Sequence, residues 1–494
     1  MNLTSLQNGS DIRGVALCIP GGKPQNLTNE AAVRIGMAFT HWLKKKTGKA
    51  SPSVSLGRDS RLTGESLLSH IAYGLSLLGA DVTSFGMAST PAMFMSTITK
   101  GYLFDGAIMI TASHLPPERN GFKFFTADGG LEKSDIAEIL SIADNCGDIF
   151  IDELTPRQVD FMSVYCDMMA DFIRKGVDSD DFMHPLKGLH IIVDAGHGAG
   201  GFFATNILKS LGANIEGSQF LTPDGNFPAH SPNPEDKKAM ESLKKAVLSS
   251  KADMGIILDP DVDRAAIVLG DGSEINRNRL IAMLSAIVLR DHPGSFIVTD
   301  SITSTGLATY IKAHGGIHRR FKRGYRNVIN EALRLNKEGH DCQLAIETSG
   351  HGAFLENNFL DDGAYIAAKL IVEFARCRKE GLRINDLLSG LDEPADAIEI
   401  RLEIDDPDFA AYGEKVLSEL TAICHNTPGI VPETENYEGI RCNVPEFKGW
   451  FLLRMSLHDP VMPLNIESDI KSGVNAIKDI VASMLKDFDK LRGW

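Results

Sequence analysis

Short apolar strands alternate with helical segments over most of this chain, and few folds accommodate such a pattern. Apolar strand patterns occur at residues 53–56, 81–85, 106–110, 189–193, 213–216, 254–258, 296–298 and 343–346. Helical patterns separate these strands at 64–78 and in segments that run through Leu211 and through His314. Strands that alternate with helices form parallel sheets with right-handed crossovers. The sequence therefore predicts an α/β fold of three consecutive α/β domains with mixed, mainly parallel sheets.

The C-terminal part of the chain has a different pattern. Residues 397–403 and 450–455 are typical of strands in an antiparallel sheet, and 470–491 are typical of a closing helix. This pattern predicts a smaller α+β domain. A length of 494 residues suits three or four domains at about 150 residues each. We expect the four domains at 1–158, 159–276, 277–393 and 394–494.

Charge and composition exclude several classes of protein. Lysine and arginine total 50 against 65 aspartates and glutamates, a formal net charge of −15, whereas a general nucleic-acid binder needs a basic face. The apolar stretches, such as 280–289, are shorter than the roughly 20 residues that cross a bilayer. We therefore expect neither a nucleic-acid partner nor a membrane partner.

The cysteines and the N-terminus bear on the compartment. Seven cysteines are scattered along the chain without a C-x-x-C pair, which argues against a disulfide framework and against a zinc knuckle. The first residues, MNLTSLQNGSDIRG, lack the basic and apolar regions of a secretion signal. The sequence predicts a cytoplasmic protein, and the stroma of a plastid after removal of a transit peptide is also compatible with it.

Three alternating carboxylates follow the buried strand pattern at 254–258. Asp259, Asp261 and Asp263 have the spacing at which side chains of an extended segment point the same way. Carboxylates gathered on one face repel one another unless a cation neutralises them, and ligands that are all oxygen favour Mg²⁺. The spacing also occurs at the start of an EF-hand, but no glycine or closing glutamate follows in register. The remaining alternative is a polar loop without a metal.

A candidate nucleophile follows the strand pattern at 106–110. Ser113 lies where α/β sheets place their ligands, at the carboxyl end of the strand, and His114 is its neighbour. Lys123 comes after Asn120-Gly121, a dipeptide typical of a turn that would fold back toward the serine. Alone, this segment is a weak signal, and its combination with the three aspartates strengthens it.

Three further patterns allow two interpretations each. Gly196, Gly198 and Gly201 form G-x-G-x-x-G after a strand, with Glu216 beyond, which fits a dinucleotide site or a tight turn that binds nothing. The segment 345–351 (AIETSGH) suits sugar hydroxyls or the capped start of a helix. The basic run 318–326 (HRRFKRGYR) is a local anion site or solvated charge.

Taken together and in this order, the motifs resemble those of the α-D-phosphohexomutase superfamily. The resemblance covers the whole chain: SDIRG at 10–14, GRDSR at 57–61, TASH at 111–114 followed by NGFK, PDGNFPAHSPNPE at 223–235, DPDVDR at 259–264 and ETSGH at 347–351. It implies four domains around a central cleft, a phosphorylated Ser113, and Mg²⁺ held by Ser113, Asp259, Asp261 and Asp263.

The resemblance also implies roles for other residues. Arg13, Lys123 and His351 match the family's acid/base and substrate-orienting positions, and Glu347 and Ser349 match those that bind the sugar hydroxyls. The remaining expected substrate ligands are His114, Arg264, Arg323, Arg326, Arg454, Ser456 and His458. A sugar 1,6-bisphosphate is expected as activator or phosphoryl donor, hexose phosphates are the expected partners, and the chain is expected to be a monomer or a homodimer.

Two loops depart from the family's pattern. Leu457 and His458 replace a glycine and a threonine of the C-terminal phosphate loop, and the segment 461–463 supplies no second cation. In the metal loop, Pro260 and Val262 replace glycines, which is expected to stiffen the loop without removing a ligand. We expect the basic run at 319–326 to compensate for the altered phosphate loop.

The sequence leaves three functions open. The first is a mutase that moves phosphoryl groups between positions 1 and 6 of a hexose phosphate, such as glucose or mannose phosphate, through a 1,6-bisphosphate. The second is a glucose-1,6-bisphosphate synthase that releases the bisphosphate because its phosphate loop is altered. The third, a sugar-phosphate sensor without catalysis, is disfavoured because Ser113, Lys123 and the aspartates are all present.

Overall fold

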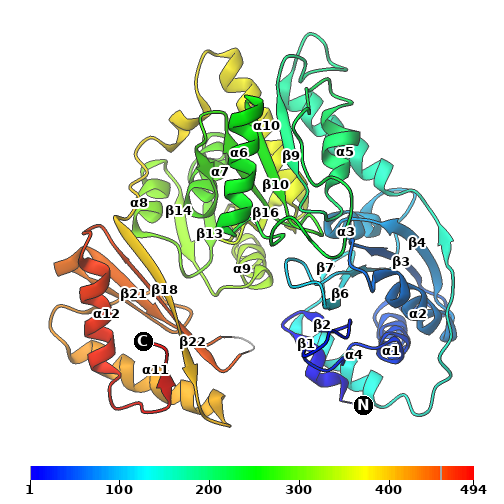
Figure 1. The fold of residues 1–494 in the computed structure, drawn as a ribbon, viewed down its shortest axis with the longest axis horizontal. Coiled ribbons are helices and arrows are strands. Elements are labelled where there is room, and N and C mark those ends of the chain that lie inside the picture. Colours follow the sequence, from blue (N-terminus) through cyan, green and yellow to red (C-terminus); the bar gives the residue numbers. More distant parts are fainter. Residues whose placement is uncertain (1, 457–458) are drawn as a thin grey trace. The chain divides into compact units, whose positions relative to one another are not determined.

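The chain passes repeatedly between two structural units (Figure 1). The computed structural model describes residues 2–456 and 459–494. Unit 1 contains the chain up to Leu280 together with Ser349–Asp386, and unit 2 contains Ile281–Thr348 and Leu387–Trp494. The predicted serine and metal segments therefore belong to unit 1, and the C-terminal segment belongs to unit 2.

The first sheet of unit 1 has the strand order β1-β2-β6-β5-β3-β4-β8, with β7 paired to β6. Its strands are β1 (Gln7–Asn8), β2 (Asp11–Val15), β3 (Ser53–Arg58), β4 (Asp81–Met87), β5 (Gly106–Ile110), β6 (Arg119–Thr126), β7 (Gly129–Gly130) and β8 (Arg157–Gln158). Strands β5, β3, β4 and β8 are parallel, and β1, β2 and β6 add antiparallel pairs. The strands predicted in this region are confirmed.

Four helices accompany this sheet: α1 (Asn29–Thr47), α2 (Gly64–Leu77), α3 (Thr90–Ile98) and α4 (Lys133–Asp144). Helices α1, α2 and α4 supply much of a continuous apolar core that includes Phe39, Trp42 and Ile71. A short 3-10 turn, η1 (Leu3–Leu6), adds Leu3 and Leu6 to the same core. The predicted helix at 64–78 is α2.

The second sheet of unit 1 has the order β12-β11-β10-β9. Its strands are β9 (Ile191–Asp194), β10 (Met254–Leu258), β11 (Ala265–Leu269) and β12 (Glu274–Ile275), and its helices are α5 (Met162–Val177) and α6 (Lys237–Ser250). Only β10 and β9 are parallel. Antiparallel pairs are thus more frequent here than expected, because residues 259–264 reverse the chain and return β11 beside β10 as a hairpin.

The sequence overestimated the regular structure between β9 and α6. The helix expected to run through Leu211 is limited to a π-helical turn, η2 (Phe203–Leu208). The strand expected at 213–216 is reduced to a single bridge between His190 and Asn214. Ala213 and Leu211 are buried, so their apolar character reflects packing and not a ladder of strand hydrogen bonds.

Residues 349–386 return the chain to unit 1. They form the hairpin β16 (Gly352–Phe354) and β17 (Leu360–Asp361), the short turns η3 (Leu355–Asn357) and η4 (Ile384–Leu388), and helix α10 (Gly363–Lys379). Helix α10 packs against α5, and the buried hydroxyl of Tyr165 donates a 2.7 Å hydrogen bond to Asp362 at the start of α10. This contact joins α5 to the start of α10, in the segment that follows the predicted sugar loop.

In unit 2, three parallel strands lie in the order β14-β13-β15. They are β13 (Phe296–Thr299), β14 (Ile317–Arg320) and β15 (Cys342–Ile346), and the helices of this part are α7 (Arg277–Asp291), α8 (Thr305–Ala313) and α9 (Tyr325–Lys337). The boundary between the units falls within α7. The expected strands at 296–298 and 343–346 and the helix ending near His314 are confirmed.

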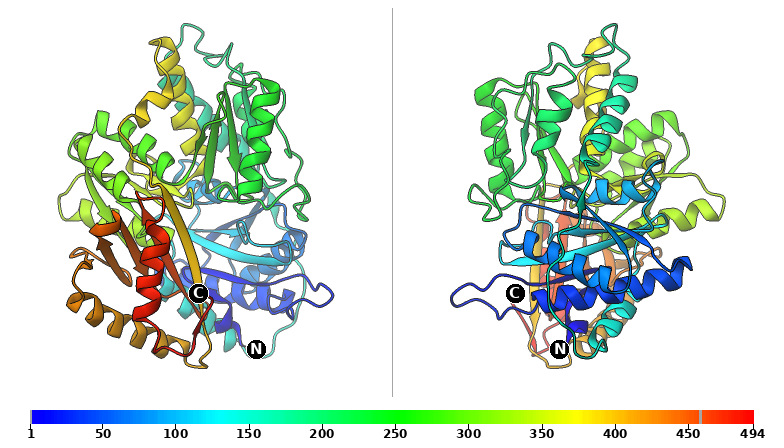
Figure 2. Two further views of the ribbon diagram at one scale, coloured as in Figure 1. Left: turned by 60° about the vertical axis from the view of Figure 1, so that its left-hand side comes forward. Right: turned by 90° about the vertical axis from the view of Figure 1, so that its right-hand side faces the viewer.

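The last part of unit 2 is an antiparallel sheet of order β19-β20-β21-β22-β18-β23. Its strands are β18 (Asp396–Ile404), β19 (Val431–Pro432), β20 (Ile440–Val444), β21 (Gly449–Leu453), β22 (Val461–Ser468) and β23 (Leu491–Arg492); its helices are α11 (Phe409–Asn426) and α12 (Gly473–Met484), and η5 (Pro445–Phe447) is a 3-10 turn. Figure 2 shows α12, in red, lying along this sheet. The α+β character is confirmed.

The closing helix is shorter than expected. Helix α12 ends at Met484, and Leu491 pairs with Ile404 of β18 as part of β23. Phe488 and Leu491 are both buried in the core of the antiparallel sheet. Their apolar side chains extended the helical pattern in the sequence, although they follow the helix as irregular chain and strand.

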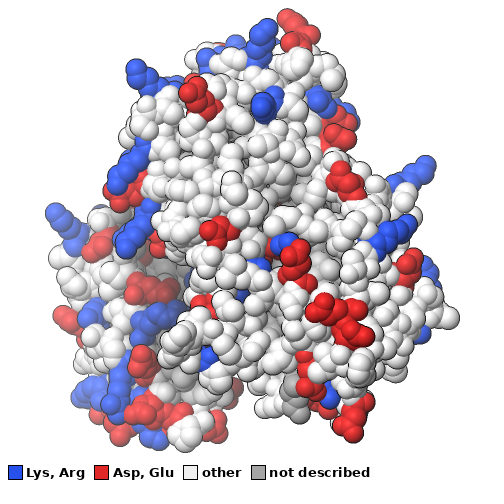
Figure 3. Space-filling view, turned by 45° about the vertical axis from the view of Figure 1, so that its right-hand side comes forward, with Lys and Arg blue, Asp and Glu red and all other residues white. Residues whose placement is uncertain are grey.

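The predicted domain limits at 158, 276 and 393 fall at the end of β8, immediately before α7 and in the segment before β18, and they stay predictions. Among the described residues, no helix combines the length and the apolar character that a membrane crossing requires. On the face drawn in Figure 3, acidic and basic side chains are interspersed.

A close approach between α1 and α2 gives a prediction about stability. A Cβ added to Gly74 would lie 2.1 Å from the carbonyl oxygen of Val33, so the helices must separate to accept it. We expect Gly74→Ala to lower the free energy of unfolding by about 2 kcal/mol, although alanine favours the helix. Leu77→Ala, at an exposed position of the same helix, is the control and should change it by less than about 0.5 kcal/mol. Equal effects in chemical denaturation would contradict this account of the packing.

Candidate active site

The three aspartates of the sequence pattern meet in the loop that follows β10. Asp259, Asp261 and Asp263 are buried, and one carboxylate oxygen from each lies within 4.8 Å of the others. Oδ1 of Asp261 is buried and accepts no hydrogen bond from the residues the structure describes. A buried anionic oxygen without a donor fits a cation, and three carboxylates favour a hard ion such as Mg²⁺. The residues present therefore fit the expected metal.

Val262, in the middle of this loop, has a backbone conformation that valine rarely adopts. Its φ is +65°, in the left-handed region where a β-branched residue is strained. The Val262 N–H donates to Asp259 O at 3.1 Å, its carbonyl accepts from Gly363 N at 2.9 Å, and its side chain is fully buried. These contacts impose the conformation, so the loop keeps a left-handed turn without a glycine.

Lys123, on β6, faces the aspartates from the first sheet. Its Nζ donates to Asp261 Oδ2 at 2.9 Å and also to Asp263 Oδ2. Thr90, at the first turn of α3, donates its hydroxyl to the same oxygen of Asp261 at 2.6 Å. Elements from two sheets thus converge on one group of carboxylates.

The aspartates differ in their protonation. Burial, together with the charges of Asp263 and Asp261, holds the pKa of Asp259 well above its usual range. Burial also disfavours ionisation of Asp263, but Lys123, His351 and Arg264 outweigh it and hold the pKa of Asp263 well below its usual range. Without a metal, the basic neighbours of Asp263 therefore favour its ionised form. Burial and the acidic neighbours of Asp259 favour its protonated form.

Ser113 lies against this group, in the loop that follows β5. Its side chain is fully buried, and its hydroxyl donates a 2.9 Å hydrogen bond to Asp259 Oδ2. Arg264 donates to the same hydroxyl oxygen at 2.7 Å. The φ of Ser113 is +50°, so this residue also adopts the left-handed conformation. The loop therefore directs the hydroxyl toward the carboxylates at a cost in backbone energy.

Arg264 connects Ser113 to two histidines. It contacts the Nδ1 of His114, and its Nε donates to Nε2 of His351 at 3.2 Å. Ser349 Oγ and His351 Nδ1 lie 2.9 Å apart, and the main chains of Arg264 and His351 form a β-bridge. The charge of Arg264 and burial hold the pKa of His114 well below its usual range, so this imidazole is neutral.

Arg13, on β2, reaches the loop of the nucleophile. It donates to the carbonyl of Ala112 at 3.1 Å and to Asp11 at 2.8 Å. Unit 1 therefore brings together all the expected site residues that it contains: Arg13, Ser113, His114, Lys123, Asp259, Asp261, Asp263, Arg264, Ser349 and His351.

The predicted turn at Asn120-Gly121 is wrong. Both residues lie within β6, and the N–H of Thr111 donates to the carbonyl of Gly121 at 3.0 Å. The chain reverses earlier, between Ser113 and Arg119, so that β6 runs back beside β5. Lys123 still reaches the carboxylates beside Ser113, because the antiparallel ladder returns it alongside β5.

The G-x-G-x-x-G segment contacts the metal loop. A Cβ on Gly198 would lie 2.4 Å from Cα of Pro260, and the N–H of Ala199 donates to the carbonyl of Pro260 at 2.8 Å. The contact requires glycine, which favours the tight-turn interpretation over a dinucleotide site.

A second group of expected residues lies in unit 2. Burial lowers the pKa of Arg454; the charge of Glu438 opposes this effect, and the charge of Arg323 adds to it. The charges of Arg323 and Arg454 both act on Glu399. Arg454 is 7% exposed, and its Nε donates no hydrogen bond within the described chain. Burial disfavours ionisation of Glu399, but Asn465, Arg323 and Arg454 outweigh it and lower its pKa. Two neighbouring guanidinium groups, one with an orphaned buried N–H, suit an anion.

The loop between β14 and α9 connects this group to the sugar loop. The N–H of Gly324 donates to Glu347 Oε1 at 2.6 Å, and the N–H of Arg323 donates to Glu438 at 3.2 Å. Arg326 lies in the first turn of α9. Ser456 Oγ accepts from the N–H of Asp459 at 3.4 Å, and His458 lies outside the described residues together with Leu457.

The arginines of the basic run have different partners. Arg319 contacts Tyr437 and Glu435, and Arg320 pairs with Glu433 at 3.4 Å and donates to the carbonyl of Ser304 at 3.0 Å. The charges of Arg319 and Arg320 are thus engaged by acidic groups of unit 2. Among the described residues of this run, Arg323 is the one whose charge acts on Arg454.

Sequence reasoning missed residues that support the site without carrying an obvious signal. Thr90 binds Asp261, Arg61 binds the loop of Ser113, and Glu399 accompanies Arg454. Arg61 belongs to GRDSR, which was noted only for its resemblance, and Thr90 belongs to a capped helix start. Their roles depend on contacts with distant segments, which no local pattern reveals.

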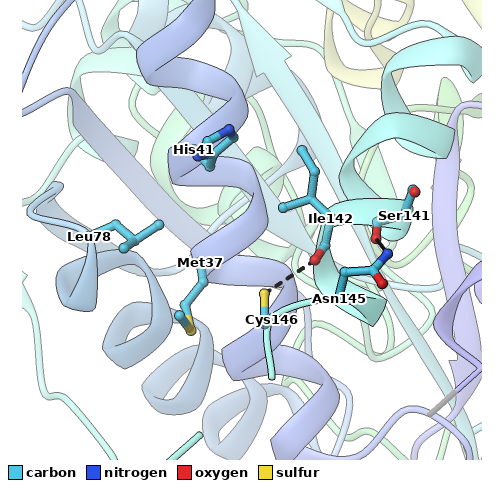
Figure 4. Close-up of a pocket in the computed structure, with 7 residues that line it drawn as sticks. All are labelled: Met37, His41, Leu78, Ser141, Ile142, Asn145 and Cys146. Atoms are coloured by element: carbon cyan, nitrogen blue, oxygen red, sulfur yellow. Dashed lines mark hydrogen bonds between the residues drawn. The ribbon is translucent and has the colours of Figure 1, made fainter. Parts of the chain in front are cut away.

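A cavity of about 370 Å³ in unit 1 holds none of the expected site residues (Figure 4). It lies between α1 and α4 and is lined by Met37, His41 and Cys146, among others. The thiol of Cys146 already donates to the carbonyl of Ile142, and Asn145 to that of Ser141.

Comparisons with known proteins agree with this geometry. Residues 5–147, 164–272 and 276–391 match the models of phosphoglucomutase/phosphomannomutase alpha/beta/alpha domains I, II and III. The chain is 30% identical over 478 residues to a phosphoglucomutase of Neisseria gonorrhoeae, covering 95% of this chain and 94% of that protein. It is 28% identical over 488 residues to a phosphomannomutase/phosphoglucomutase of Pseudomonas aeruginosa, covering 98% and 96%.

A solved structure gives the same result. The crystal structure of a phosphoglucomutase/phosphomannomutase family protein from Burkholderia thailandensis superposes with a TM-score of 0.78 at 28% identity, covering 98% of each chain. The fold and the matched domains are those of the α-D-phosphohexomutase superfamily, a class of enzymes. Within this class, the chain belongs to the phosphoglucomutase/phosphomannomutase family.

The different surroundings of the aspartates predict different effects of their substitution in the absence of metal. Asp263→Asn leaves the buried ammonium of Lys123 with one carboxylate fewer, so we expect the free energy of unfolding to fall by about 3 kcal/mol in chelator. Asp259→Asn relieves repulsion at a carboxylate whose pKa is raised. We expect the free energy of unfolding of this variant in chelator to be unchanged or higher.

Thermal melts in chelator and in millimolar Mg²⁺ check both statements. The unsubstituted protein should gain stability with Mg²⁺, and both variants should gain less. If the two variants melt alike in chelator, the charge distribution described here is incorrect.

Proposed function

We propose that this protein interconverts hexose 1-phosphates and hexose 6-phosphates, such as those of glucose and mannose, by transfer through a phosphorylated Ser113. The observation that carries the proposal is the hydrogen bond of the buried Ser113 hydroxyl to Asp259, within the group of three carboxylates. A hydroxyl placed against a cation site is suited to carry a phosphoryl group. The names of the relatives support the same reaction.

In the transfer step, the bond between the serine oxygen and phosphorus breaks while a bond forms between phosphorus and a sugar hydroxyl oxygen. The proton of that hydroxyl passes to a basic group, and the serine oxygen, which retains the electron pair of the broken bond, takes up a proton and becomes a hydroxyl again. Mg²⁺ held by Asp259, Asp261 and Asp263 would neutralise charge on the phosphoryl oxygens. His351 and Lys123 are the candidates for proton transfer.

Arg264 is placed to bind the phosphoryl group on Ser113. Its guanidinium donates to the serine oxygen at 2.7 Å, and it contacts the neutral imidazole of His114. Arginine binds phosphate oxygens through paired hydrogen bonds, which fixes orientation as well as charge. We assign Arg264 and His114 to holding the phosphoryl group, and Arg13 to orienting the sugar phosphate beside them.

Sugar hydroxyls are assigned to the loop around residues 347–349. Glu347 can accept hydrogen bonds from two hydroxyls, and Ser349 can accept and donate. Glu347 belongs to the same loop contacts as Arg323, because Gly324 donates to its carboxylate. A sugar hydroxyl at Glu347 therefore lies on the same side of unit 2 as the proposed phosphate site.

The phosphate that does not react is assigned to Arg323 and Arg454, with Ser456 and Arg326 as further candidates. Arg454 is buried and close to Arg323, and two like charges in a buried place favour an anion between them. The segment 461–463 lies in β22 and contributes no cation. Arg323 would thus supply the positive charge that the altered phosphate loop lacks.

A second candidate function is the synthesis of glucose 1,6-bisphosphate. It is favoured by the departures at Leu457, His458 and Pro463, of which Pro463 lies in β22 paired with Arg401. A weak hold on the second phosphate would release the bisphosphate before it turns around. In this case the bisphosphate is the product, and in the mutase it is the activator or phosphoryl donor.

One experiment separates these functions. Purified protein with Mg²⁺ is supplied with glucose 1-phosphate and a catalytic amount of glucose 1,6-bisphosphate, and all phosphorylated sugars are followed over time. Conversion to glucose 6-phosphate at constant bisphosphate supports the mutase. Accumulation of bisphosphate, in the presence of a phosphoryl donor, supports the synthase. No turnover of any hexose phosphate would refute both.

Ser113→Ala removes the oxygen that carries the phosphoryl group. We expect at least a thousandfold loss of kcat, since the transfer has no other route through this site. Mass spectrometry should find a phosphoryl group on the Ser113 peptide of the unsubstituted protein after incubation with the bisphosphate. Ser349→Ala, at another hydroxyl of unit 1, should retain that modification. Full activity of the Ser113→Ala variant would overturn the mechanism.

Arg323→Gln tests the second phosphate site. Loss of a guanidinium that binds phosphate should raise KM for glucose 1-phosphate by tenfold or more, about 1.4 kcal/mol, with little change in melting temperature. The combined Arg323→Gln and Arg326→Gln variant should raise it at least as far. Arg319→Gln, in the same run but engaged with Tyr437 and Glu435, is the control and should leave KM within twofold. A drop in stability at unchanged KM for Arg323→Gln would make this residue structural.

A further inference from the structure

Arg61 binds the loop of Ser113 with the four N–H groups of its two terminal nitrogens. Its Nη2 donates to the carbonyls of Ser113 and, at 2.6 Å, Leu115. Its Nη1 donates to the carbonyls of Pro116 at 2.7 Å and Arg119 at 2.8 Å, and its Nε donates to Asp59 at 3.2 Å. The five donors of a guanidinium thus meet five acceptors, four of which are main-chain carbonyls of one loop.

The other side of Ser113 is held by a chain of hydrogen bonds that returns to the same arginine. The N–H of Ser113 donates to the hydroxyl of Thr111 at 2.8 Å. That hydroxyl donates to Asp59 Oδ2 at 2.7 Å, the oxygen that also accepts from Nε of Arg61. Both peptide groups of Ser113 are therefore fixed through Arg61 and Asp59.

This arrangement accounts for the left-handed backbone of Ser113. A residue with a side chain costs about 1–3 kcal/mol in such a conformation and keeps it only where the surroundings over-determine it. With φ at +50°, the hydroxyl lies 2.9 Å from Asp259 Oδ2. Relaxation of the loop to an ordinary conformation would turn the hydroxyl away from the carboxylates.

Arg61 is itself held on all sides. Its side chain is fully buried, and its guanidinium lies over the ring of Phe227 at 5.1 Å. A lysine offers three donors from a single nitrogen and cannot span four carbonyls, so its substitution for arginine would leave acceptors unmatched while keeping the charge.

We propose that Arg61 is a positioning residue for phosphoryl transfer: by binding the main chain of residues 113–119, it holds Ser113 in the left-handed conformation that directs its hydroxyl at the carboxylate group. Arg61 touches neither substrate nor phosphoryl group in this role. The catalytic part of the inference rests on the proposed function, whereas the effect on the loop does not.

The test compares Arg61→Lys with Arg441→Lys. Arg441 is the matched control, because it is equally buried, pairs with Glu433 at 3.0 Å and donates to the carbonyls of Ser301 and Thr303 at 2.9 and 3.1 Å, all in unit 2. Three quantities are measured for each: hydrogen exchange of the peptides that cover residues 112–120, melting temperature, and kcat and KM for glucose 1-phosphate.

For Arg61→Lys we expect at least tenfold faster exchange in residues 112–120 and about a hundredfold loss of kcat, with KM within threefold, because a displaced nucleophile impairs the chemical step more than binding. Arg441→Lys should lower the melting temperature comparably and leave the exchange of this segment and kcat within threefold. Equal losses of kcat in the two variants, or unchanged exchange in Arg61→Lys, would overturn the proposal.

Two further measurements keep the outcome decisive. If Arg61→Lys does not fold, Thr111→Val removes the hydroxyl on the other side of Ser113 in a side chain of the same shape, and it should lower kcat about tenfold with faster exchange at Ser113. Unchanged kcat and exchange in that variant would refute the proposal. If the unsubstituted protein turns over no hexose phosphate, the proposed function fails, and the hydrogen exchange of Arg61→Lys still decides whether Arg61 holds the loop.

Discussion

Mutual repulsion of three buried carboxylates is the constraint that organises unit 1. Asp259, Asp261 and Asp263 follow a fully apolar strand, so they have no water with which to share their charge. Their charge is compensated by Lys123 of β6 and by Arg264, which immediately precedes β11. Thr90 of α3 adds a hydrogen bond to Asp261. The group of carboxylates is therefore buried where elements of the first and second sheets meet.

The parts of the fold that the sequence predicted are those in which local pattern and burial agree. Strand β10 is apolar and buried throughout, and α2 has one apolar stripe, so each was found. The predictions for the segment around Ala213 and for the chain beyond Met484 were wrong, because buried side chains there pack without regular main-chain hydrogen bonds. Apolar periodicity reports which side chains are inside, and it does not report which backbone groups pair.

The site was predictable to the extent that its residues lie at strand ends. Ser113 and the aspartates follow β5 and β10, so their positions could be inferred from the topology alone. The role of Arg61 could not be inferred in this way. Four of its five acceptors are main-chain carbonyls, which every residue has, so the sequence does not indicate which of them it binds. The different contacts within the basic run could not be predicted for a similar reason: Arg319 and Arg323 are the same residue type, and only their partners, Tyr437 and Glu438 between β19 and β20, distinguish them.

The strained conformation of Val262 bears on how a cation would enter the group of aspartates. A glycine at this position would be free to leave the left-handed region whenever the loop loosens, and the loop would have to be ordered anew for each ion. A buried valine whose neighbours enforce its conformation gives the loop a single shape before any ion arrives. A cation that entered this loop would need no folding of the chain, so we expect its rate of entry to depend on how fast the hydrated ion loses its water molecules, which is slow for Mg²⁺.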